Sequence, residues 1–186
     1  MSRFEELPTR IFLDSSTLQT LQTYGEFIWE NYEVPETDRI RKVTNGIENL
    51  EALRKIFIVN DRAQFEFALS ENSLIEVRDR GHHNYLQWAY DVLDHWQACL
   101  DSYDGAAFTD KGELVASWLD GSSFGYLGEK DRRLIQDAVR LECDAFLTME
   151  RRLPRNAGHI QRELGIRVLT PIQLGEVLQP WAGLFA

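Results

Sequence analysis

Four short apolar segments, separated by longer stretches with helical spacing, constrain the fold of this chain more than any other feature. The segments are Arg10–Leu13 and residues 64–69, 145–148 and 167–170. Each has the length of a strand, and residues 64–69 alternate in the manner of one. Between the segments the apolar residues recur at steps of three and four, as on one face of a helix. Strands joined through helices run parallel and form a sheet that helices cover on both faces. The sequence therefore predicts a three-layer α/β/α fold with a central parallel sheet, of the Rossmann-like kind.

Helical stretches account for most of the remaining chain. We expect an enlarged helical region at about residues 19–62 and a long helix at about residues 73–100, which Gly81 could interrupt. The composition shows no break along the 186 residues, and this length fits one well-filled core. We therefore expect residues 1–186 to form a single domain.

Composition also bears on where the protein works. No stretch approaches the roughly 20 uncharged apolar residues that a membrane span requires, and acidic residues near the start replace the apolar run of a secretion signal. Cys99 and Cys143 lie in apolar helical patterns, where buried reduced thiols are expected rather than a disulfide or a nucleophile. We expect a soluble cytoplasmic protein with no membrane partner.

The charge of the chain limits how it could bind nucleic acid. A net charge of −10 counts against coating nucleic acid by bulk electrostatics, because phosphates attract clustered Lys and Arg. Residues 129–167 are the exception, with nine basic side chains against seven acidic ones. Any contact with a polyanion is expected there. Carboxylates at a metal site would also contribute to the negative total, although the ion would neutralise part of them.

Four scattered acids lie where a parallel sheet would bring them together. Asp14 ends the first strand, Glu76 lies about two helical turns beyond the second, Asp131 begins the helix before the third, and Glu150 follows the third. Ligands of such folds bind beyond the carboxyl ends of the strands. Gathered carboxylates repel one another unless a cation lies among them, and Mg²⁺ or Mn²⁺ suits such oxygen ligands. An ion of this kind could polarise a phosphodiester and activate water.

Each acid also has a purely structural explanation. Asp131 could cap its helix or complement the helix dipole, and Glu76 could lie on a solvated helix face. Asp14 is the hardest to explain in this way, because a carboxylate that ends an apolar strand is costly to bury without compensation.

The acids and their neighbours resemble the signature of the PIN-domain nucleases. In residues 130–150 an Asp opens a helix, a small residue follows seven positions later, and an apolar strand ends in Thr, any residue, then an acid. Residues 10–18 and 68–76 look like the family's first strand with its acid and its second strand with a serine and a helix-borne Glu. The resemblance implies a PIN-like fold. It also implies catalytic and metal-binding roles for Asp14, Glu76, Asp131 and Glu150, with Thr148 as the hydroxyl residue beside them.

The resemblance further implies an activity and partners. A PIN-like protein would be an endoribonuclease that uses Mg²⁺ or Mn²⁺ for water attack on RNA. Ser15, Arg151 and Arg152 are candidates for substrate contacts near the metal, although capping and generic surface charge explain them as well. Many relatives of this kind are toxins held inactive by a small antitoxin protein, and many form homodimers.

A second interpretation stays open beside the first. The family usually has Asp where this chain has Glu150, the surface is acidic, and the helical regions are long. These features fit a catalytically weak or inactive PIN-fold module that binds RNA or another protein. Other enzyme classes lose support, because the sequence has no glycine-rich phosphate loop, no GxGxxG and no GxSxG elbow. A haloacid-dehalogenase-like phosphatase would need Asp at the position of Ser16.

Overall fold

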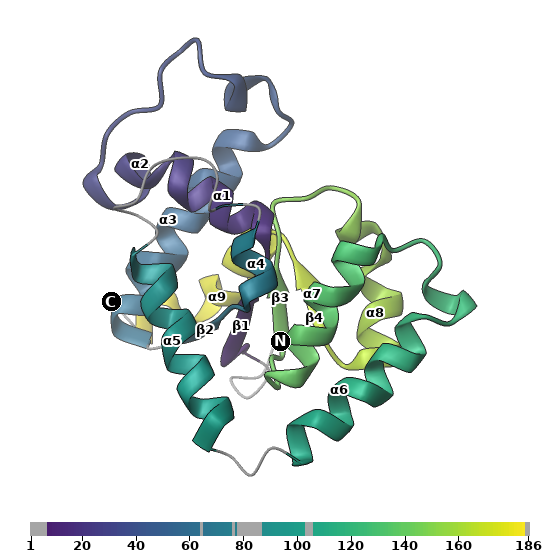
Figure 1. Ribbon diagram of the computed structural model, residues 1–186. Coiled ribbons are helices and arrows are strands. Elements are labelled where there is room, and N and C mark those ends of the chain that lie inside the picture. The colour runs from purple at the N-terminus through teal and green to yellow at the C-terminus, as the bar shows by residue number, and fades with distance from the viewer. Residues whose placement is uncertain (1–6, 64, 76, 78–86, 103–105, 185–186) are drawn as a thin grey trace.

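A computed structural model of the chain describes residues 7–63, 65–75, 77, 87–102 and 106–184. It contains a four-stranded sheet flanked by helices (Figure 1). The strands are β1 (Arg10–Leu13), β2 (Glu66–Ala68), β3 (Ala145–Leu147) and β4 (Arg167–Leu169). Every neighbouring pair is parallel, and the order across the sheet is β2-β1-β3-β4. The predicted α/β fold with a parallel sheet is confirmed, so the carboxyl ends of all four strands share one edge.

Helices follow every strand. The α-helices are α1 (Ser15–Thr23), α2 (Gly25–Glu30), α3 (Gly46–Ala63), α4 (Glu71–Ile75), α5 (Gln87–Ser102), α6 (Ala106–Leu119), α7 (Glu129–Arg140), α8 (Ala157–Leu164) and α9 (Pro171–Leu178). Short 3-10 helices are η2 (Arg39–Lys42), η4 (Ser122–Phe124), η5 (Leu153–Asn156) and η6 (Gln179–Leu184). Local chemistry explains several boundaries. Gly165 ends α8 in the left-handed conformation at φ 76°, and Thr170 opens α9 with a capping box.

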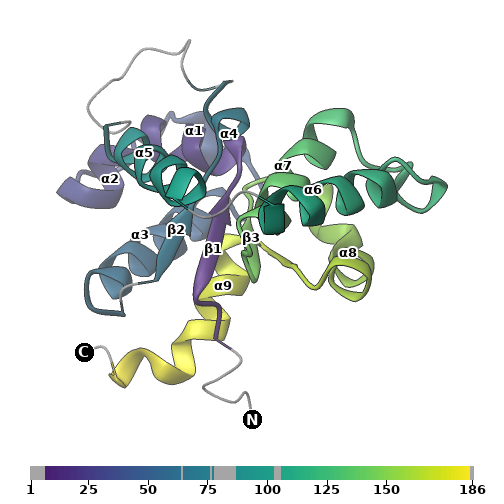
Figure 2. The same cartoon turned by 60° about the horizontal axis from the view of Figure 1, so that its bottom comes forward.

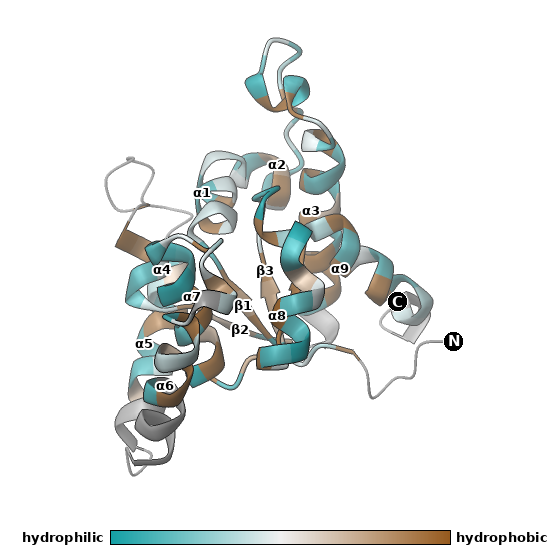
Figure 3. Cartoon of the chain, turned by 90° about the vertical axis from the view of Figure 1, so that its right-hand side faces the viewer, coloured by the Kyte–Doolittle hydropathy of each residue, from teal (hydrophilic) through white to brown (hydrophobic). Residues whose placement is uncertain are grey.

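The two faces of the sheet bury different cores. Side chains alternate along β1, so Ile11 and Leu13 point to one face and Phe12 to the other. The first face packs against buried side chains of α1, α3 and α9, and the second against those of α6, α7 and α8. Figure 2 shows these groups of helices around the sheet, and Figure 3 shows apolar strands between helices whose outer sides are hydrophilic. Most residues of the strands are therefore buried, whereas Glu66 at the start of β2 is exposed.

The helical regions differ in detail from the prediction. The region at about residues 19–62 contains most of α1, all of α2 and η2 and most of α3, with irregular chain between α2 and η2. In place of one helix over 73–100, α4 ends at Ile75, Val77 lies in a turn, and α5 begins at Gln87. Gly81 lies outside the described residues. Sequence periodicity did not separate α4 from α5, because both place apolar residues at helical spacing.

Polar contacts fix the opposite, amino-terminal edge of the sheet. The carboxylate of Asp144 accepts hydrogen bonds from the backbone N–H and hydroxyl of Thr9, both at 2.9 Å, and from the Arg10 N–H at 3.3 Å.

Cys143 is buried at this edge as a free thiol, and burial raises its pKa far above the ordinary value. It is therefore an inert core residue, as expected, whereas the Cys99 side chain lies outside what is described. Within the described residues, no helix is long and apolar enough to cross a membrane.

Candidate functional site

A cavity of about 380 Å³ opens at the edge of the sheet where β1 and β3 end. Its walls come from the start of α1, from α4, from the start of α7 and from the chain that follows β3. Asp14, Asp131 and Glu150 all line this cavity. The structure thus brings three of the four acids singled out in the sequence to one place. Glu76, the fourth, lies outside the residues that the structure describes.

Asp14 is the buried acid of the cavity, with 4% of its surface exposed. It caps α1 by accepting a hydrogen bond from the Thr17 backbone N–H at 2.7 Å. The hydroxyl of Thr148, itself fully buried, donates to Asp14 Oδ2 at 2.5 Å. Ser16 Oγ lies 2.9 and 2.8 Å from the two carboxylate oxygens. The carboxylate therefore faces three donors within hydrogen-bond distance.

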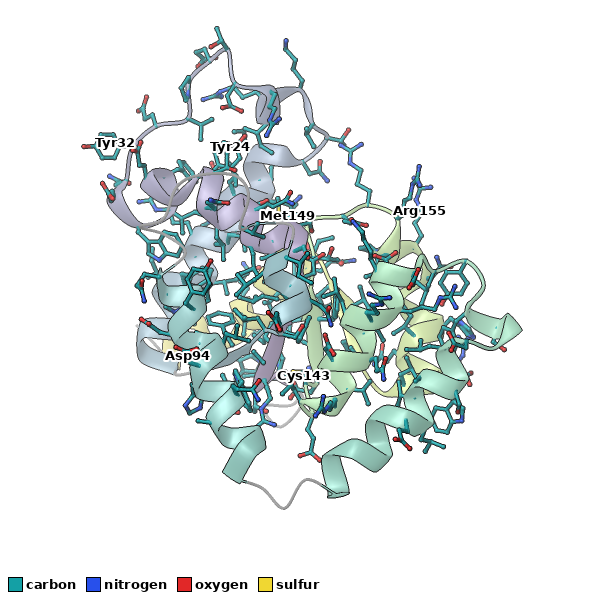
Figure 4. All side chains as sticks on the ribbon, in the orientation of Figure 1. Tyr24, Tyr32, Asp94, Cys143, Met149 and Arg155 are labelled. Carbon is teal, nitrogen blue, oxygen red and sulfur yellow. The ribbon has the colours of Figure 1, made fainter. Side chains whose placement is uncertain are left out.

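Backbone groups orient the two hydroxyls toward Asp14. The Met149 N–H donates to Ser16 Oγ, and the Glu150 N–H donates to Thr148 Oγ1, both at 3.0 Å. A hydroxyl that already accepts such a bond has its own hydrogen available for the carboxylate. Figure 4 labels Met149 at the carboxyl end of β3, at the opposite end of the strand from Cys143. The first turn after β3 is thus built to hold donors against Asp14.

Counting acceptor positions indicates what else Asp14 can bind. An ionised carboxylate offers about four lone-pair positions. The Thr17 N–H, the Thr148 O–H and the single hydroxyl hydrogen of Ser16 occupy three of them, and the Thr17 hydroxyl also acts on this carboxylate. The donors of the described residues therefore leave at most one position on Asp14 for a further donor or a cation.

Burial makes the ionised form of Asp14 costly. Desolvation raises the pKa of this carboxyl above its ordinary value, and it outweighs the hydrogen bonds from Thr148, Thr17 and Ser16, which lower it. A nearby positive charge would favour the ionised form and reverse the shift. The cavity therefore holds an acid that a cation would stabilise.

Asp131 and Glu150 are less buried than Asp14. Asp131 is half-buried in the first turn of α7, a helix preceded by Gly128 at the N-cap, which provides no side-chain cap. Its carboxylate is therefore well placed for the helix dipole as well as for the cavity. Glu150 is exposed. Among the described residues, no three His, Cys, Asp or Glu side chains are grouped closely enough to hold a metal ion. An ion at Asp14 would thus complete its coordination with water or with further groups.

Basic side chains near the cavity are partly different from those expected. Lys130 and Arg133, on α7, line it, and Arg133 also pairs with Glu129. Arg151 does not line it, because its guanidinium donates to the Thr44 carbonyl at 3.1 Å. Arg152 is exposed and also lies outside the lining. The substrate contacts suggested for Arg151 and Arg152 are therefore not placed at this cavity.

Several lining residues were missed or undervalued in the sequence. Ser15 is buried and lines the cavity, as its candidate role requires. The hydroxyl of Ser16 contacts the Asp14 carboxylate directly. Asn72 also lines the cavity and donates to Asp137 Oδ2 at 2.8 Å. The position of Asn72 shortly after β2 was the available signal, since that strand ends at the same edge as β1 and β3.

Comparisons of the chain with models of known protein families, with curated proteins and with solved structures found no match. The function must therefore be inferred from the cavity and from the residues that line it.

Proposed function

We propose that the chain is a metal-dependent endoribonuclease of the PIN-like kind, which hydrolyses RNA phosphodiesters at this cavity. The observation that carries the proposal is the convergence of Asp14, Asp131 and Glu150, from three separate segments, on one cavity at the carboxyl edge of a parallel sheet. A cavity of about 380 Å³ has room for a phosphate group together with ions and water.

The donor set fits a hard divalent ion. The three acids offer carboxylate oxygens, which Mg²⁺ and Mn²⁺ prefer, and no histidine or cysteine of the described residues lines the cavity. The donors of the described residues leave Asp14 at most one acceptor position, and its raised pKa is one that a cation would reverse. When bound, such an ion would activate water and stabilise negative charge on the phosphate. Glu76 is proposed as a further ligand on the strength of the sequence resemblance.

The other residues would position the substrate and the acid. Lys130 and Arg133 place positive charge beside the cavity, where a phosphate would be attracted. Thr148 and Ser16 act on Asp14, because their hydroxyls hold its carboxylate in one orientation. Ser15, at the start of α1, is a candidate for binding water or substrate. A small antitoxin protein and a homodimer remain part of the proposal through the resemblance alone.

A cleavage assay tests the proposal. Purified protein with Mn²⁺ or Mg²⁺ is expected to cut several unrelated single-stranded RNAs, and Asp14→Asn and Asp131→Asn are expected to lose at least about a hundredfold in rate. Asp94→Asn is the matched control, since Asp94 is exposed on α5 and labelled far from the cavity in Figure 4. If Asp14→Asn cuts as fast as the wild type, the proposed active site is wrong.

One observation favours a second candidate. Because no three described acids are grouped closely enough to hold an ion, the chain also fits a weak or inactive module that binds RNA or a protein. Retained RNA binding with no cleavage in any divalent metal would favour this candidate. Metal-dependent cleavage that the Asp14 variant abolishes would exclude it.

A further inference from the structure

A second hollow, of about 530 Å³, lies along α1 beside the acidic cavity. Ser16 and Gln19 line both cavities, so the two lie next to each other along this helix. Met149, whose backbone N–H donates to Ser16 Oγ, also lines the hollow. Another part of the lining comes from η2 and from Val43, the residue that follows it. A ligand in the acidic cavity could therefore extend into this hollow without leaving the surface.

One wall of this hollow carries a basic side chain. Arg39 lines it and is exposed, and residues 38–44 contain three basic side chains and one acidic one, Asp38, which lies beside Arg39. Arg41 holds this wall in place, because its guanidinium donates to the carbonyls of Val34 at 2.7 Å and Pro35 at 3.0 Å. In a chain with net charge −10, such a segment marks a place for negative charge.

A second arginine lies close to the same wall. Arg151 is exposed and donates to the Thr44 carbonyl, which brings it beside the chain that follows η2. The sequence predicted polyanion contacts in residues 129–167, and this bond joins that region to the segment after η2.

The remaining lining suits a nucleoside. Tyr24 lines the hollow half-buried, and its hydroxyl lies 2.8 Å from Asp38 Oδ1, which fixes the ring (Figure 4). Thr20 and Thr23 donate their hydroxyls to α1 carbonyls at 2.8 and 2.7 Å, so their oxygens remain able to accept. A fixed aromatic ring, hydroxyl oxygens and a guanidinium are the groups that bind an unstacked base and its phosphate.

We propose that the hollow between α1 and η2 binds a nucleotide that flanks the cleaved phosphate of single-stranded RNA, with Arg39 on the backbone phosphate and Tyr24 beside the base. This inference rests on the proposed function, since it places the cleaved phosphate in the neighbouring acidic cavity. A recess of about 530 Å³ accepts one splayed nucleotide, whereas a paired base in a duplex cannot enter it.

Binding measured without cleavage tests this proposal separately from the nuclease activity. The probe is a fluorescent single-stranded oligouridylate, titrated in EDTA, with a duplex RNA of the same length as comparison. Arg39→Ala is expected to weaken binding of the single strand about tenfold, the loss of one charge-assisted phosphate contact. It should also reduce the salt dependence of log K by about 0.7. Arg162→Ala removes an exposed arginine of α8 that lines neither cavity, and it is expected to bind within about twofold of the wild type.

The proposal is overturned if Arg39→Ala binds the single strand as tightly as Arg162→Ala, if the wild type binds no single-stranded RNA, or if the duplex binds equally well. A second measurement covers a variant that fails to fold. Oligonucleotides containing 4-thiouridine should crosslink to residues 19–24 or 39–43 of the wild type, and crosslinks found only elsewhere would also overturn it. If Asp14→Asn no longer cleaves RNA but still binds the single strand tightly, and this binding depends on Arg39, both proposals are supported. If the wild type cleaves no RNA but shows the same Arg39-dependent binding, only the nuclease proposal is contradicted.

Discussion

Replacing Thr148 with Val tests how the chain stabilises its buried acid. Thr148 is fully buried, donates to Asp14 Oδ2 at 2.5 Å and accepts from the Glu150 N–H at 3.0 Å. A hydrogen bond to a charged group contributes about 1.5–3 kcal/mol and a neutral one about 0.5–1.5 kcal/mol. Valine fills nearly the same space, so the loss is mostly that of the two bonds. Above the raised pKa of Asp14, where its carboxylate is ionised, we expect the variant to be about 2–4 kcal/mol less stable.

This loss should depend on pH, because one of the two bonds is made to a titrating group. The folded-state pKa of Asp14 is raised above its ordinary value of 3.8, chiefly by burial. Folding therefore favours the protonated carboxyl over the ionised one. The stability that the protonated form adds to the folded protein is fully present below pH 3.8 and is lost as the pH rises through the raised pKa. Removing the Thr148 donor raises this pKa further. The difference between variant and wild type should therefore be smallest in acid and grow toward neutral pH.

Urea unfolding in EDTA at several pH values measures both effects. Ser73→Ala is the matched control, since Ser73 is equally buried but its hydroxyl accepts from the neutral Ser70 N–H at 3.3 Å. That variant should lose about 1 kcal/mol, with little change across the pH range. Equal losses for Thr148→Val at acid and neutral pH, or the same profile as Ser73→Ala, would refute the reasoning about Asp14.

Three further predictions concern the scaffold and the acid itself. Phe146→Ala should lose about 3–5 kcal/mol of unfolding free energy, because the ring is fully buried and stacks on Phe12 with 5.4 Å between the ring centroids. Trp29 is 40% exposed, so Trp29→Ala should lose much less. A small loss for Phe146→Ala would contradict the packing of this face of the sheet. Asp144→Ala should lose about 1–3 kcal/mol of unfolding free energy, because its hydrogen bonds to Thr9 and Arg10 are removed. RNA cleavage by the folded protein should stay unchanged. A stable variant that no longer cleaves RNA would contradict the separation of the two sheet edges. In EDTA near neutral pH, Asp14→Asn should melt at a higher temperature than the wild type, because a neutral amide avoids the desolvation of a charge. This difference in melting temperature should disappear below pH 3.8. A lower melting temperature of Asp14→Asn at neutral pH would show that the hydrogen bonds to the carboxylate outweigh the cost of its burial.

Local patterns predicted the fold because each strand and its following helix are signalled within a few residues. The apolar runs at β1 and β3 and the helix-starting residues after β1 gave the parallel arrangement without any long-range information. The order of the strands was not predicted, since it depends on which crossovers pack on which face. The break between α4 and α5 was also left open, because helical spacing continues across it.

The sequence predicted that Asp14, Asp131 and Glu150 lie at one edge of the sheet, but it did not predict their contacts. Convergence of Asp14, Asp131 and Glu150 follows from strand ends that share an edge, which the sequence pattern contains. The donation of the Thr148 and Ser16 hydroxyls to Asp14 depends on backbone N–H groups of the turn after β3, which have no sequence signature. The direction of Arg151, toward Thr44 and away from the cavity, depends on a segment more than a hundred residues away. Such contacts are set by tertiary packing.

Thermal unfolding with Mn²⁺ and no RNA tests the central claim most directly, because it asks only whether a divalent ion binds at Asp14. At a hundred times the dissociation constant the ion should stabilise the wild type by about 2.7 kcal/mol, and the melting temperature should rise with the logarithm of concentration. Asp14→Asn should show no such rise, whereas Asp94→Asn should follow the wild type. An equal rise in Asp14→Asn, or no rise in the wild type, would contradict a metal site in this cavity.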